Sequence, residues 1–378
     1  MSADPMETAA RSPETEGASV RLAEIRKELD KLDSHILDLL NQRAALCREV
    51  GRLKTESRES VYKPFREKEV LRALIRKNAG VLPDDHLLAI YREILSSSRR
   101  LQQPQTIVYL GPEGTFSYFA GVEYLGRSAE FRPCMTLREV FKSVFTREAQ
   151  LGIIPLENSL QGTVGQCLDL FLEHDVHIQA EVFCKISHAL LSPEKSMAVI
   201  RRVYSHPQAL EQCSNWLRIH LPEASIVPTE STAAAARKVI DADGCAAIGH
   251  EKLADMLGLN ILSRQIEDLP DNWTRFMIIG AAPPEGGSQD KTSLLFTLPD
   301  KSGALVRVLT LLARRNINMK KLESRPLRAE KWQYVFFADV ECDLSSDEYG
   351  ELKRELAENC HSLRILGSYP AGRHLFRV

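Results

Sequence analysis

Apolar residues recur every three or four positions over a long stretch near the N-terminus. Leu22 and Ile25 begin this series, and it continues to Leu53. Such spacing places the apolar side chains on one face of a single long amphipathic helix. Two shorter helical patterns follow, at 63–78 and 84–101. Because two short helices cannot cover so long an apolar face, the pattern predicts pairing with a second copy of the chain.

The pattern changes near Pro104. Between 106 and 280, short strand-like apolar runs alternate with helices and glycine turns, which is typical of an α/β domain. A linker-like stretch rich in proline, glycine and serine occupies 281–290. Beyond it, strands and helices follow in the order βαββαβ, an α+β ferredoxin-like arrangement. The strands of this last part are predicted at 292–298, 318–324, 332–341 and 363–368, and its helices at 304–314 and 347–359.

These patterns divide the chain into four parts. With 378 residues, 44% of them apolar, the chain is long enough to form several separate hydrophobic cores. We expect a multidomain protein with a disordered tail at 1–19, an all-α helical domain at 20–103, an α/β domain at 105–281 and an α+β domain at 290–378.

Charge and cysteine content narrow the function and the compartment. The net charge is only −2, so no global field favours nucleic acid, and an anionic ligand must be held by local cations. Eight cysteines are scattered without a CxxC pair, which is typical of reduced thiols in a cytosolic protein. The N-terminal residues lack the apolar run of a signal peptide, and no segment has the roughly 18 consecutive apolar residues of a membrane span. We therefore expect a cytoplasmic protein that binds neither nucleic acid nor membrane.

Polar residues interrupt the apolar face of the long helix. Arg43 stands where the series would place an apolar residue, and Lys54 follows about three turns later on nearly the same face. Burying an unpaired guanidinium is costly, so Arg43 either contacts an anionic ligand, pairs with an internal acid or extends into solvent. In the third helix the apolar face continues into Ser98, with Gln102 one turn further. Pattern alone leaves these alternatives open.

The helical segment resembles the all-α chorismate mutases. The similarity runs through LAEIRKELDKLDSHILDLLNQRAALCREVGRLK, VYKPFREKEVL and YREILSSSRRLQQ. In that family, which uses no cofactor, cations hold the carboxylates of chorismate while donors stabilise charge on the ether oxygen as prephenate forms. At Lys63 the chain departs from the family pattern, in which an acid often occurs. The resemblance implies that Arg26 from the partner chain, Arg43, Arg66 and Ser98 bind carboxylates, Lys54 and Gln102 address the ether oxygen, and Glu67 binds the ring hydroxyl.

Polar motifs follow the apolar runs of the central segment. GPEGTFS at 111–117 lies between a strand and a helix, where backbone amides can approach an anion, although a plain tight turn is the alternative. Ligands of open α/β sheets collect at strand ends, so we expect such motifs to line one site. The others are IPLENSLQGTV at 154–164, YSHPQALEQC at 204–213, PTESTAAAA at 228–236 and DNWTRF at 271–276.

Taken together, these motifs resemble the prephenate dehydratases over about residues 105–280. The resemblance implies two α/β lobes around a cleft, like those of periplasmic binding proteins, with the chain returning to the first lobe at its end. Enzymes of this family remove carbon dioxide and the ring hydroxyl of prephenate to give phenylpyruvate, without a cofactor. No GxGxxG fingerprint occurs, which argues against a dehydrogenase acting on the same substrate.

The dehydratase resemblance also implies a set of cleft residues. Thr274 is expected to help the hydroxyl depart as water by donating within a hydrogen-bond network, and Arg275 is expected to anchor a carboxylate. For Ser159, Ser231 and Thr232, helix capping or turn bonding is an equally good interpretation. The other residues expected at the cleft are Glu157, Asn158, Thr163, Ser205, Gln208, Gln212 and Phe276.

Three histidines invite a chemical role but are left out of the site. His206 precedes a proline, as turn residues often do. His174 and His177 have only Glu173 and Asp175 near them in the sequence, so a solvated helix end is favoured and no metal site is predicted.

The last segment resembles the ACT domains attached to prephenate dehydratases. PDKSGALVRVL and KLESRPLR carry the similarity. In that family a phenylalanine pocket forms between subunits, and preferential binding to one arrangement of the subunits gives feedback inhibition. By itself, Gly303 would be only a turn residue near a helix start. The resemblance implies L-phenylalanine as effector and a pocket bordered by Gly303, Ala304, Leu305, Glu323, Ser324, Arg325 and Pro326.

Two interpretations of the whole chain remain. The first is a cofactor-free bifunctional enzyme that converts chorismate to prephenate and then to phenylpyruvate, responds to phenylalanine and forms a homodimer or homotetramer. The second is a non-catalytic sensor whose lobes and ACT domain only bind small molecules. The enzyme is favoured by the presence of Thr274, Arg43, Lys54 and Glu67. A non-catalytic sensor does not need a group of polar residues that assists bond breaking. A narrower alternative keeps only the dehydratase active, with Lys63 marking a weakened mutase.

Overall fold

The computed structural model describes residues 13–57, 59–285, 290–327 and 334–375. The chain divides into two compact units. One unit contains the residues up to Glu59 together with Leu101–Gln103, and the other contains Ser60–Arg100 and the chain from Pro104 onward. None of the described helices combines the length and the apolar character needed to cross a membrane.

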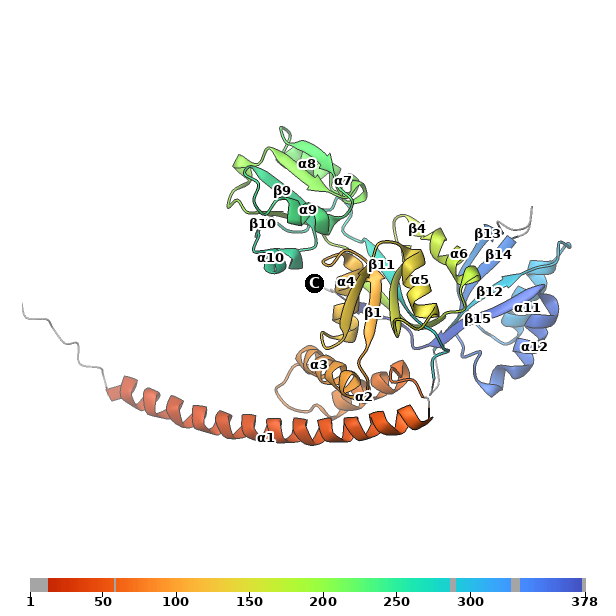
Figure 1. Ribbon diagram of the computed structural model, residues 1–378, viewed down its shortest axis with the longest axis horizontal. Coiled ribbons are helices and arrows are strands. Elements are labelled where there is room, and N and C mark those ends of the chain that lie inside the picture. The colour runs from red at the N-terminus through yellow and green to blue at the C-terminus, as the bar shows by residue number, and fades with distance from the viewer. Residues whose placement is uncertain (1–12, 58, 286–289, 328–333, 376–378) are drawn as a thin grey trace, which may run out of the picture. The chain divides into compact units, whose positions relative to one another are not determined.

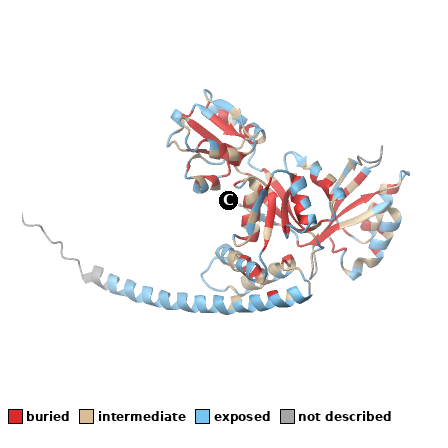
Figure 2. Cartoon of the chain, viewed as in Figure 1, coloured by how far each residue is buried: buried red, intermediate tan, exposed pale blue. Residues whose placement is uncertain are grey.

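The first unit consists mainly of one helix, α1 (Pro13–Ser57). The predicted long helix is confirmed, and its apolar face lies on the surface (Figure 2). The side chains of Leu29, Leu32 and Leu39 are 52%, 57% and 63% exposed. An exposed apolar stripe of this length is not stable by itself in water, because helices gain most of their stability from packing such a face.

Residues 13–19 belong to α1, although the sequence assigned them to a disordered tail. Pro13 suits the first turn of a helix, where its missing N–H would be unsatisfied in any case and its fixed φ is helical. No second proline follows before the end of α1. The rest of the predicted tail, 1–12, lies outside the described residues.

Two shorter helices, α2 (Pro64–Lys77) and α3 (Asp84–Gln102), match the predicted helices at 63–78 and 84–101 to within one residue at each end. In the second unit, Tyr62 just before α2 is buried in a core with residues of the first sheet. Arg92 of α3 forms an ion pair of 2.7 Å with Glu123. These contacts attach the two helices to the α/β part of the chain.

The central segment folds as two α/β lobes, each built on one sheet (Figure 1). The first sheet has seven strands, in the order β16-β5-β11-β3-β1-β2 with β4 paired to β3. Helices α4 (Phe116–Leu125), α5 (Leu137–Phe145) and α6 (Gly165–Glu173) pack on it. The strands are β1 (Thr106–Leu110), β2 (Glu130–Cys134), β3 (Leu151–Asn158), β4 (Gly162–Thr163), β5 (His177–Lys185), β11 (Trp273–Gly280) and β16 (Arg373–Leu375).

The second lobe is inserted between β5 and β11. Its five-stranded sheet has the order β10-β6-β9-β7-β8. The strands are β6 (Ala189–Ser192), β7 (Arg202–Ser205), β8 (Ser225–Pro228), β9 (Cys245–Gly249) and β10 (Asn260–Ser263). The helices are η1 (Met197–Val199), α7 (Pro207–Gln212), α8 (Ser214–His220), α9 (Thr232–Lys238) and α10 (Lys252–Leu257).

The chain crosses between the lobes twice, along two segments joined by hydrogen bonds. The backbone N–H of Ile186 donates to the carbonyl of Asn272 at 2.8 Å, and that of Ile266 donates to the carbonyl of His188 at 3.1 Å. After the second crossing, β11 enters the middle of the first sheet, antiparallel to both β3 and β5. The predicted return of the chain to the first lobe is thus confirmed.

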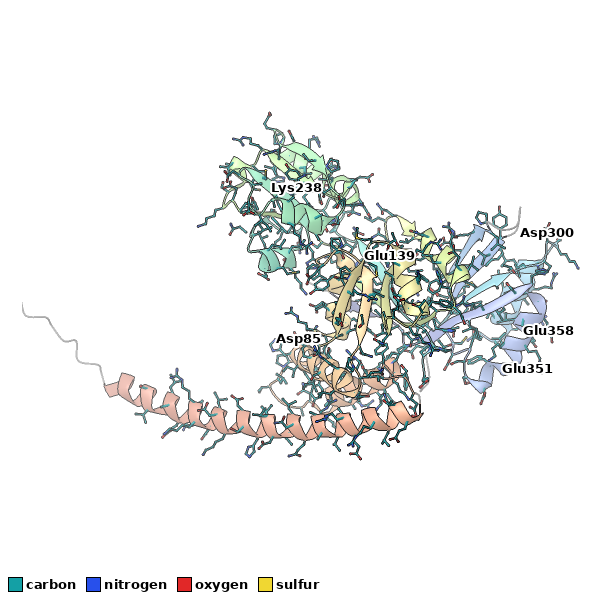
Figure 3. The ribbon with its side chains drawn as sticks, in the orientation of Figure 1. Asp85, Glu139, Lys238, Asp300, Glu351 and Glu358 are labelled. Carbon is teal, nitrogen blue, oxygen red and sulfur yellow. The ribbon has the colours of Figure 1, made fainter. Side chains whose placement is uncertain are left out.

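The C-terminal segment forms a four-stranded antiparallel sheet in the order β13-β14-β12-β15, and its βαββαβ order confirms the prediction. Leu352 and Leu356 of α12 are buried, whereas Glu351 and Glu358 point outward (Figure 3). The predicted strand start at 332 lies outside the described residues. The elements are β12 (Lys291–Thr297), α11 (Ala304–Arg314), β13 (Met319–Pro326), β14 (Tyr334–Val340), η2 (Asp347–Tyr349), α12 (Gly350–Asn359) and β15 (Ser362–Tyr369).

Strand β16 was not predicted, and it does not belong to this C-terminal sheet. It pairs in parallel with β5, with His374 opposite Phe183, and so extends the first lobe's sheet. The segment assigned to one α+β domain at 290–378 therefore ends with a strand of another sheet. Three residues are too few to give a periodic signal in the sequence.

Strand β15 packs closely across β5. A Cβ atom on Gly367 would overlap the carbonyl oxygen of Ile178. Gly367→Ala should therefore push the two strands apart and lower the free energy of unfolding by about 1–3 kcal/mol, as measured by denaturant titration.

Gly350→Ala is the matched control, because nothing lies within 4 Å of the added Cβ and Gly350 is already helical. This variant should keep the stability of the parent or gain slightly. Equal stability of the Gly367→Ala variant and the parent would contradict the close approach of the two strands.

Candidate active site

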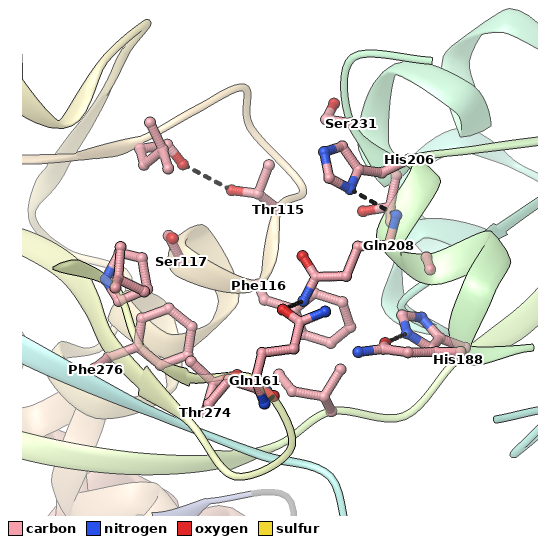
Figure 4. Close-up of a pocket in the computed structure, with 18 of the residues that line it drawn as sticks. Thr115, Phe116, Ser117, Gln161, His188, His206, Gln208, Ser231, Thr274 and Phe276 are labelled. Carbon is pink, nitrogen blue, oxygen red and sulfur yellow. Dashed lines mark hydrogen bonds between the residues drawn. The ribbon is translucent and has the colours of Figure 1, made fainter. Parts of the chain in front are cut away.

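A cavity of about 470 Å³ is lined by residues of both α/β lobes. Thr115–Ser117, Gln161, Thr274 and Phe276 come from the first lobe (Figure 4). Ser231 and Gln208 come from the second lobe, and His188 comes from the crossing between them. The motifs expected at strand ends thus meet at one place.

Asn158 sets the direction of the Thr274 hydroxyl. Its amide nitrogen donates to Thr274 Oγ1 at 3.0 Å and to Asn272 Oδ1 at 2.7 Å. Its amide oxygen accepts from the backbone N–H groups of Leu160 and Gln161, which fixes the amide orientation. Because Thr274 Oγ1 accepts a hydrogen bond from Asn158, its own proton remains to be donated elsewhere. Thr274 lines the cavity, so a bound ligand can accept that proton.

The N-terminal end of α4 also faces the cavity. Thr115 caps the helix by accepting from the backbone N–H of Tyr118, and its hydroxyl donates to the carbonyl of Leu110 at 3.1 Å. Gly114 has φ +90°, and a Cβ there would lie 2.6 Å from Leu253 Cδ2, so this turn requires glycine. The first turn of α4 contains no acid. This helix end therefore favours an anion in the cavity.

The second lobe supplies neutral hydrogen-bonding groups. Ser231 caps α9 by accepting from the N–H of Ala234 at 3.0 Å. Gln208 donates to Gln161 Oε1 at 2.5 Å, which joins the two lobes across the cavity. His206 caps α7 by accepting from the N–H of Gln208, and burial lowers the pKa of its imidazole. The turn interpretation of His206 is confirmed, although its side chain also lines the cavity.

Arg275 lies on the opposite face of β11 from Thr274. Its guanidinium binds Glu181 at 2.6 Å and Asp339 at 2.5 Å and is only 5% exposed. The structure contradicts the prediction that Arg275 anchors a carboxylate in the cleft, because neighbouring side chains on a strand point to opposite faces. Glu157 likewise faces away from the cavity and pairs with Lys321 at 2.8 Å.

Two serines predicted at the cleft do not line the cavity and instead form hydrogen bonds within the fold. Ser159 accepts from the N–H of Trp273 at 2.9 Å and donates to the carbonyl of Asp271. Ser205 is fully buried and donates to the carbonyl of Ile248 at 2.7 Å. Eight of the predicted residues do line the cavity: Asn158, Thr163, Gln208, Gln212, Ser231, Thr232, Thr274 and Phe276.

No lysine or arginine of the described chain lines this cavity. An anionic ligand would therefore be held by neutral donors and the end of α4. The cavity is also lined by Thr115, Ser117, Gln161 and His188, which were not among the individually predicted cleft residues. The GPEGTFS motif was a signal for the first two.

Strand β13 contacts the first lobe with alternate side chains. Lys321 Nζ donates to Thr163 Oγ1 at 2.7 Å, and Thr163 also hydrogen-bonds Glu323. Arg325 lies 3.6 Å from Asp169. Thr163 thus contacts both the cavity and the C-terminal sheet. The other predicted effector residues are Ser324 and Pro326 at the end of β13 and Gly303, Ala304 and Leu305 at the start of α11.

The residues predicted from the mutase resemblance are divided between the two units. In the first unit, Gln102 lines a shallow cavity with Arg48 and Arg52, and neither Arg43 nor Lys54 lines it. Arg43 donates to Cys47 Sγ within α1, and Arg26 is exposed.

In the second unit, Glu67 binds Arg99 at 2.5 Å, and Arg66 pairs with Glu69 on the surface. Ser98 is buried and donates to the carbonyl of Ile94 at 2.6 Å. Lys63 lies 3.4 Å from Glu285.

Six of the eight cysteines are buried, and all eight are free thiols. Burial raises the pKa of the Cys167 thiol to about 12, which makes it unreactive. Within the described ranges, no three His, Cys, Asp or Glu side chains come together as a metal site requires.

Three family models match successive parts of the chain. Chorismate mutase type II matches residues 25–103, prephenate dehydratase matches 107–284 and the ACT domain matches 292–354. The bifunctional chorismate mutase/prephenate dehydratase of Aquifex aeolicus is 40% identical, over 92% of this chain and 98% of its own length.

Solved structures resemble about 70% of the chain. A prephenate dehydratase from Arthrobacter aurescens in complex with L-Phe is 33% identical, with a TM-score of 0.64 over 70% of this chain and 90% of that one. GqqA, described as a novel type of quorum quenching acylase, is 31% identical, with a TM-score of 0.63 over 71% of this chain and 98% of that one. The match to the relative from Aquifex spans all three domains. The chain therefore belongs to the bifunctional chorismate mutase/prephenate dehydratase family and carries both activities together with an ACT domain.

Proposed function

We propose that prephenate binds in the cavity between the two lobes and that Thr274 assists the loss of its ring hydroxyl. The hydrogen bond from Asn158 to Thr274 carries this proposal, because it leaves the hydroxyl proton for a ligand. A volume of about 470 Å³ is in the range of pockets for small organic molecules. Phe276, beside Thr274, offers an apolar surface to the ring of the substrate.

The reaction needs donors more than a strong acid. The prephenate dianion and one proton give phenylpyruvate, carbon dioxide and water. The bond from the ring to its carboxylate breaks, its electron pair completes the aromatic ring, and the hydroxyl leaves with the added proton. A hydrogen bond from Thr274 stabilises the charge on the departing oxygen. The retained carboxylate is held by the end of α4 and by neutral donors of Gln208, Ser231 and Thr232.

For the mutase, we propose the residues implied by the family. Arg43, Arg66 and Ser98, with Arg26 of the partner subunit, bind the carboxylates of chorismate. Lys54 and Gln102 stabilise charge on the ether oxygen, and Glu67 binds the ring hydroxyl. The match to chorismate mutase type II over 25–103 supports this assignment. Domain boundaries at 20–103, 105–281 and 290–378 are proposed on the same grounds, except that α1 begins at Pro13 and that β16 (Arg373–Leu375) belongs to the sheet of the first lobe.

The two active sites should be separable by mutation. Lys54→Ala removes a cation near the ether oxygen and should lower mutase kcat by about 10²–10³-fold while sparing prephenate dehydration. Thr274→Ala removes the donor to the leaving hydroxyl and should lower dehydratase kcat by a similar factor while sparing the mutase. Both rates are measured on purified protein, by loss of chorismate and by formation of phenylpyruvate from added prephenate. Loss of both activities in either variant would contradict two independent sites.

We propose that L-phenylalanine is the effector and binds between ACT domains, bordered by residues 303–305 and 323–326. The complex of the Arthrobacter relative with L-Phe supports this choice. Glu323 and Lys321 both contact Thr163, which lines the proposed prephenate cavity. Movement of β13 on effector binding would therefore reach the dehydratase site through one side chain.

Lys321→Met tests this route. The variant keeps the length of the side chain but loses the amine that contacts Thr163 and Glu157. Inhibition by phenylalanine should weaken by about 5–100-fold in half-inhibitory concentration, while calorimetry still detects phenylalanine binding. Lys320→Met is the control, because Lys320 is exposed and pairs with Glu341 instead. Unchanged inhibition in the Lys321→Met variant would exclude this route.

We also propose a homodimer or homotetramer in the cytoplasm. The exposed apolar face of α1 supports pairing, because a second copy of the helix is the simplest cover for it. Eight unpaired cysteines support a reducing compartment.

A further inference from the structure

His188 is held rigidly at the crossing between the lobes. Its side chain is 2% exposed, and its backbone N–H donates to Glu267 Oε2 at 2.8 Å. The ring of Phe116 meets the imidazole edge-on, with ring centroids 5.6 Å apart. Because backbone and ring are both fixed, the hydrogen bonds of the imidazole have little freedom.

The imidazole has one hydrogen-bond partner among the described residues. Nε2 lies 2.9 Å from Gln212 Oε1, and Nδ1 is buried without a partner (Figure 4). A buried N–H without an acceptor is rarer in proteins than an unused acceptor, so the proton belongs on Nε2. Burial lowers the pKa of His188, which keeps the ring neutral near pH 7. Nε2–H therefore donates to the amide oxygen of Gln212.

This bond decides which end of the Gln212 amide faces a ligand. Gln212 lines the cavity, and its amide nitrogen makes no hydrogen bond to any described residue. With the oxygen committed to His188, the nitrogen presents two N–H donors. Prephenate carries only oxygen acceptors apart from its hydroxyl proton. A reversed amide would instead turn an oxygen toward a carboxylate.

We propose that His188 is a positioning residue of the dehydratase, which orients the amide of Gln212 so that its nitrogen donates to prephenate. The inference rests on the proposed placement of the substrate in this cavity. His188 does not touch the substrate in this proposal, and it acts only through its hydrogen bond to Gln212. In a cavity without lysine or arginine among the described residues, each correctly oriented neutral donor carries more of the recognition of the anion.

Two substitutions at His188 separate orientation from packing. In His188→Gln, the side-chain nitrogen reaches about as far as Nε2 and can still donate to Gln212. In His188→Asn, the nitrogen ends near the position of Nδ1 and falls short. Both replacements are polar and smaller than histidine, so the pair is matched. Chorismate mutase activity of each sample, with thermal unfolding, reports whether the chain is folded.

The measurement is kcat/KM for phenylpyruvate formation from prephenate, in the parent chain and in a Gln212→Leu background. His188→Asn should lower kcat/KM by about 10–100-fold in the parent chain. His188→Gln should recover activity, with a kcat/KM at least about fivefold higher than that of His188→Asn. In the Gln212→Leu background, His188→Asn should cost no more than about twofold, because the amide it orients is gone.

Equal losses for His188→Asn and His188→Gln, or the same factor for His188→Asn in both backgrounds, would overturn the proposal and leave His188 a packing residue. Failure of the proposed site itself looks different. In that case Thr274→Ala and Gln212→Leu would both leave kcat/KM unchanged, whatever the substitutions at His188 do.

Discussion

Strand β11 is held between β3 and β5, and this constraint organises the second unit. Hydrogen bonds on both edges prevent the strand from turning about its axis, so its side chains must alternate between two faces. Thr274 and Phe276 therefore face the cavity, while Arg275 between them faces the C-terminal sheet. One strand thus serves the proposed chemistry on one face and the attachment of the ACT domain on the other.

The ionic cluster around Arg275 makes this attachment specific. Arg275 and Lys291 share Glu181 and Asp339, and Tyr369 accepts a further hydrogen bond from the guanidinium at 3.2 Å. Burial alone would lower the pKa of Arg275, but the negative groups around it reverse this and raise its pKa above the usual value. Buried charges are costly unless each is paired. The cluster is therefore stable only when the ACT strands pack against the first lobe in this one arrangement.

The sequence predicted most of the regular elements, because their apolar patterns are long. The helix from Leu22 to Leu53 and the βαββαβ order both appear in the structure. Strand β16 was not predicted, because three residues are too few to show a period. The return of the chain through β11 came from the family resemblance rather than from the pattern.

The cleft residues were predicted less completely, because side chains that are neighbours on a strand point to opposite faces of the sheet. The DNWTRF motif was treated as one unit, although alternation along a strand would have separated Thr274 from Arg275. The same alternation along β3 would have separated Glu157 from Asn158. His188 offered no signal, since a lone histidine in an apolar run gives no sign of its hydrogen-bond partner. The proposed mutase site includes Arg26 of the partner subunit, so its assembly cannot be derived from one copy of the chain.

The most direct test of this account is a crystal structure of the protein with its product, phenylpyruvate, bound. The ligand should lie in the cavity between the lobes, with its carboxylate at the N-terminal end of α4 and with the ring carbon that has lost the hydroxyl turned toward Thr274 Oγ1. Arg275 should remain bound to Glu181 and Asp339. A ligand carboxylate bound to the Arg275 guanidinium, with Thr274 turned away from it, would contradict the division of β11 into two faces.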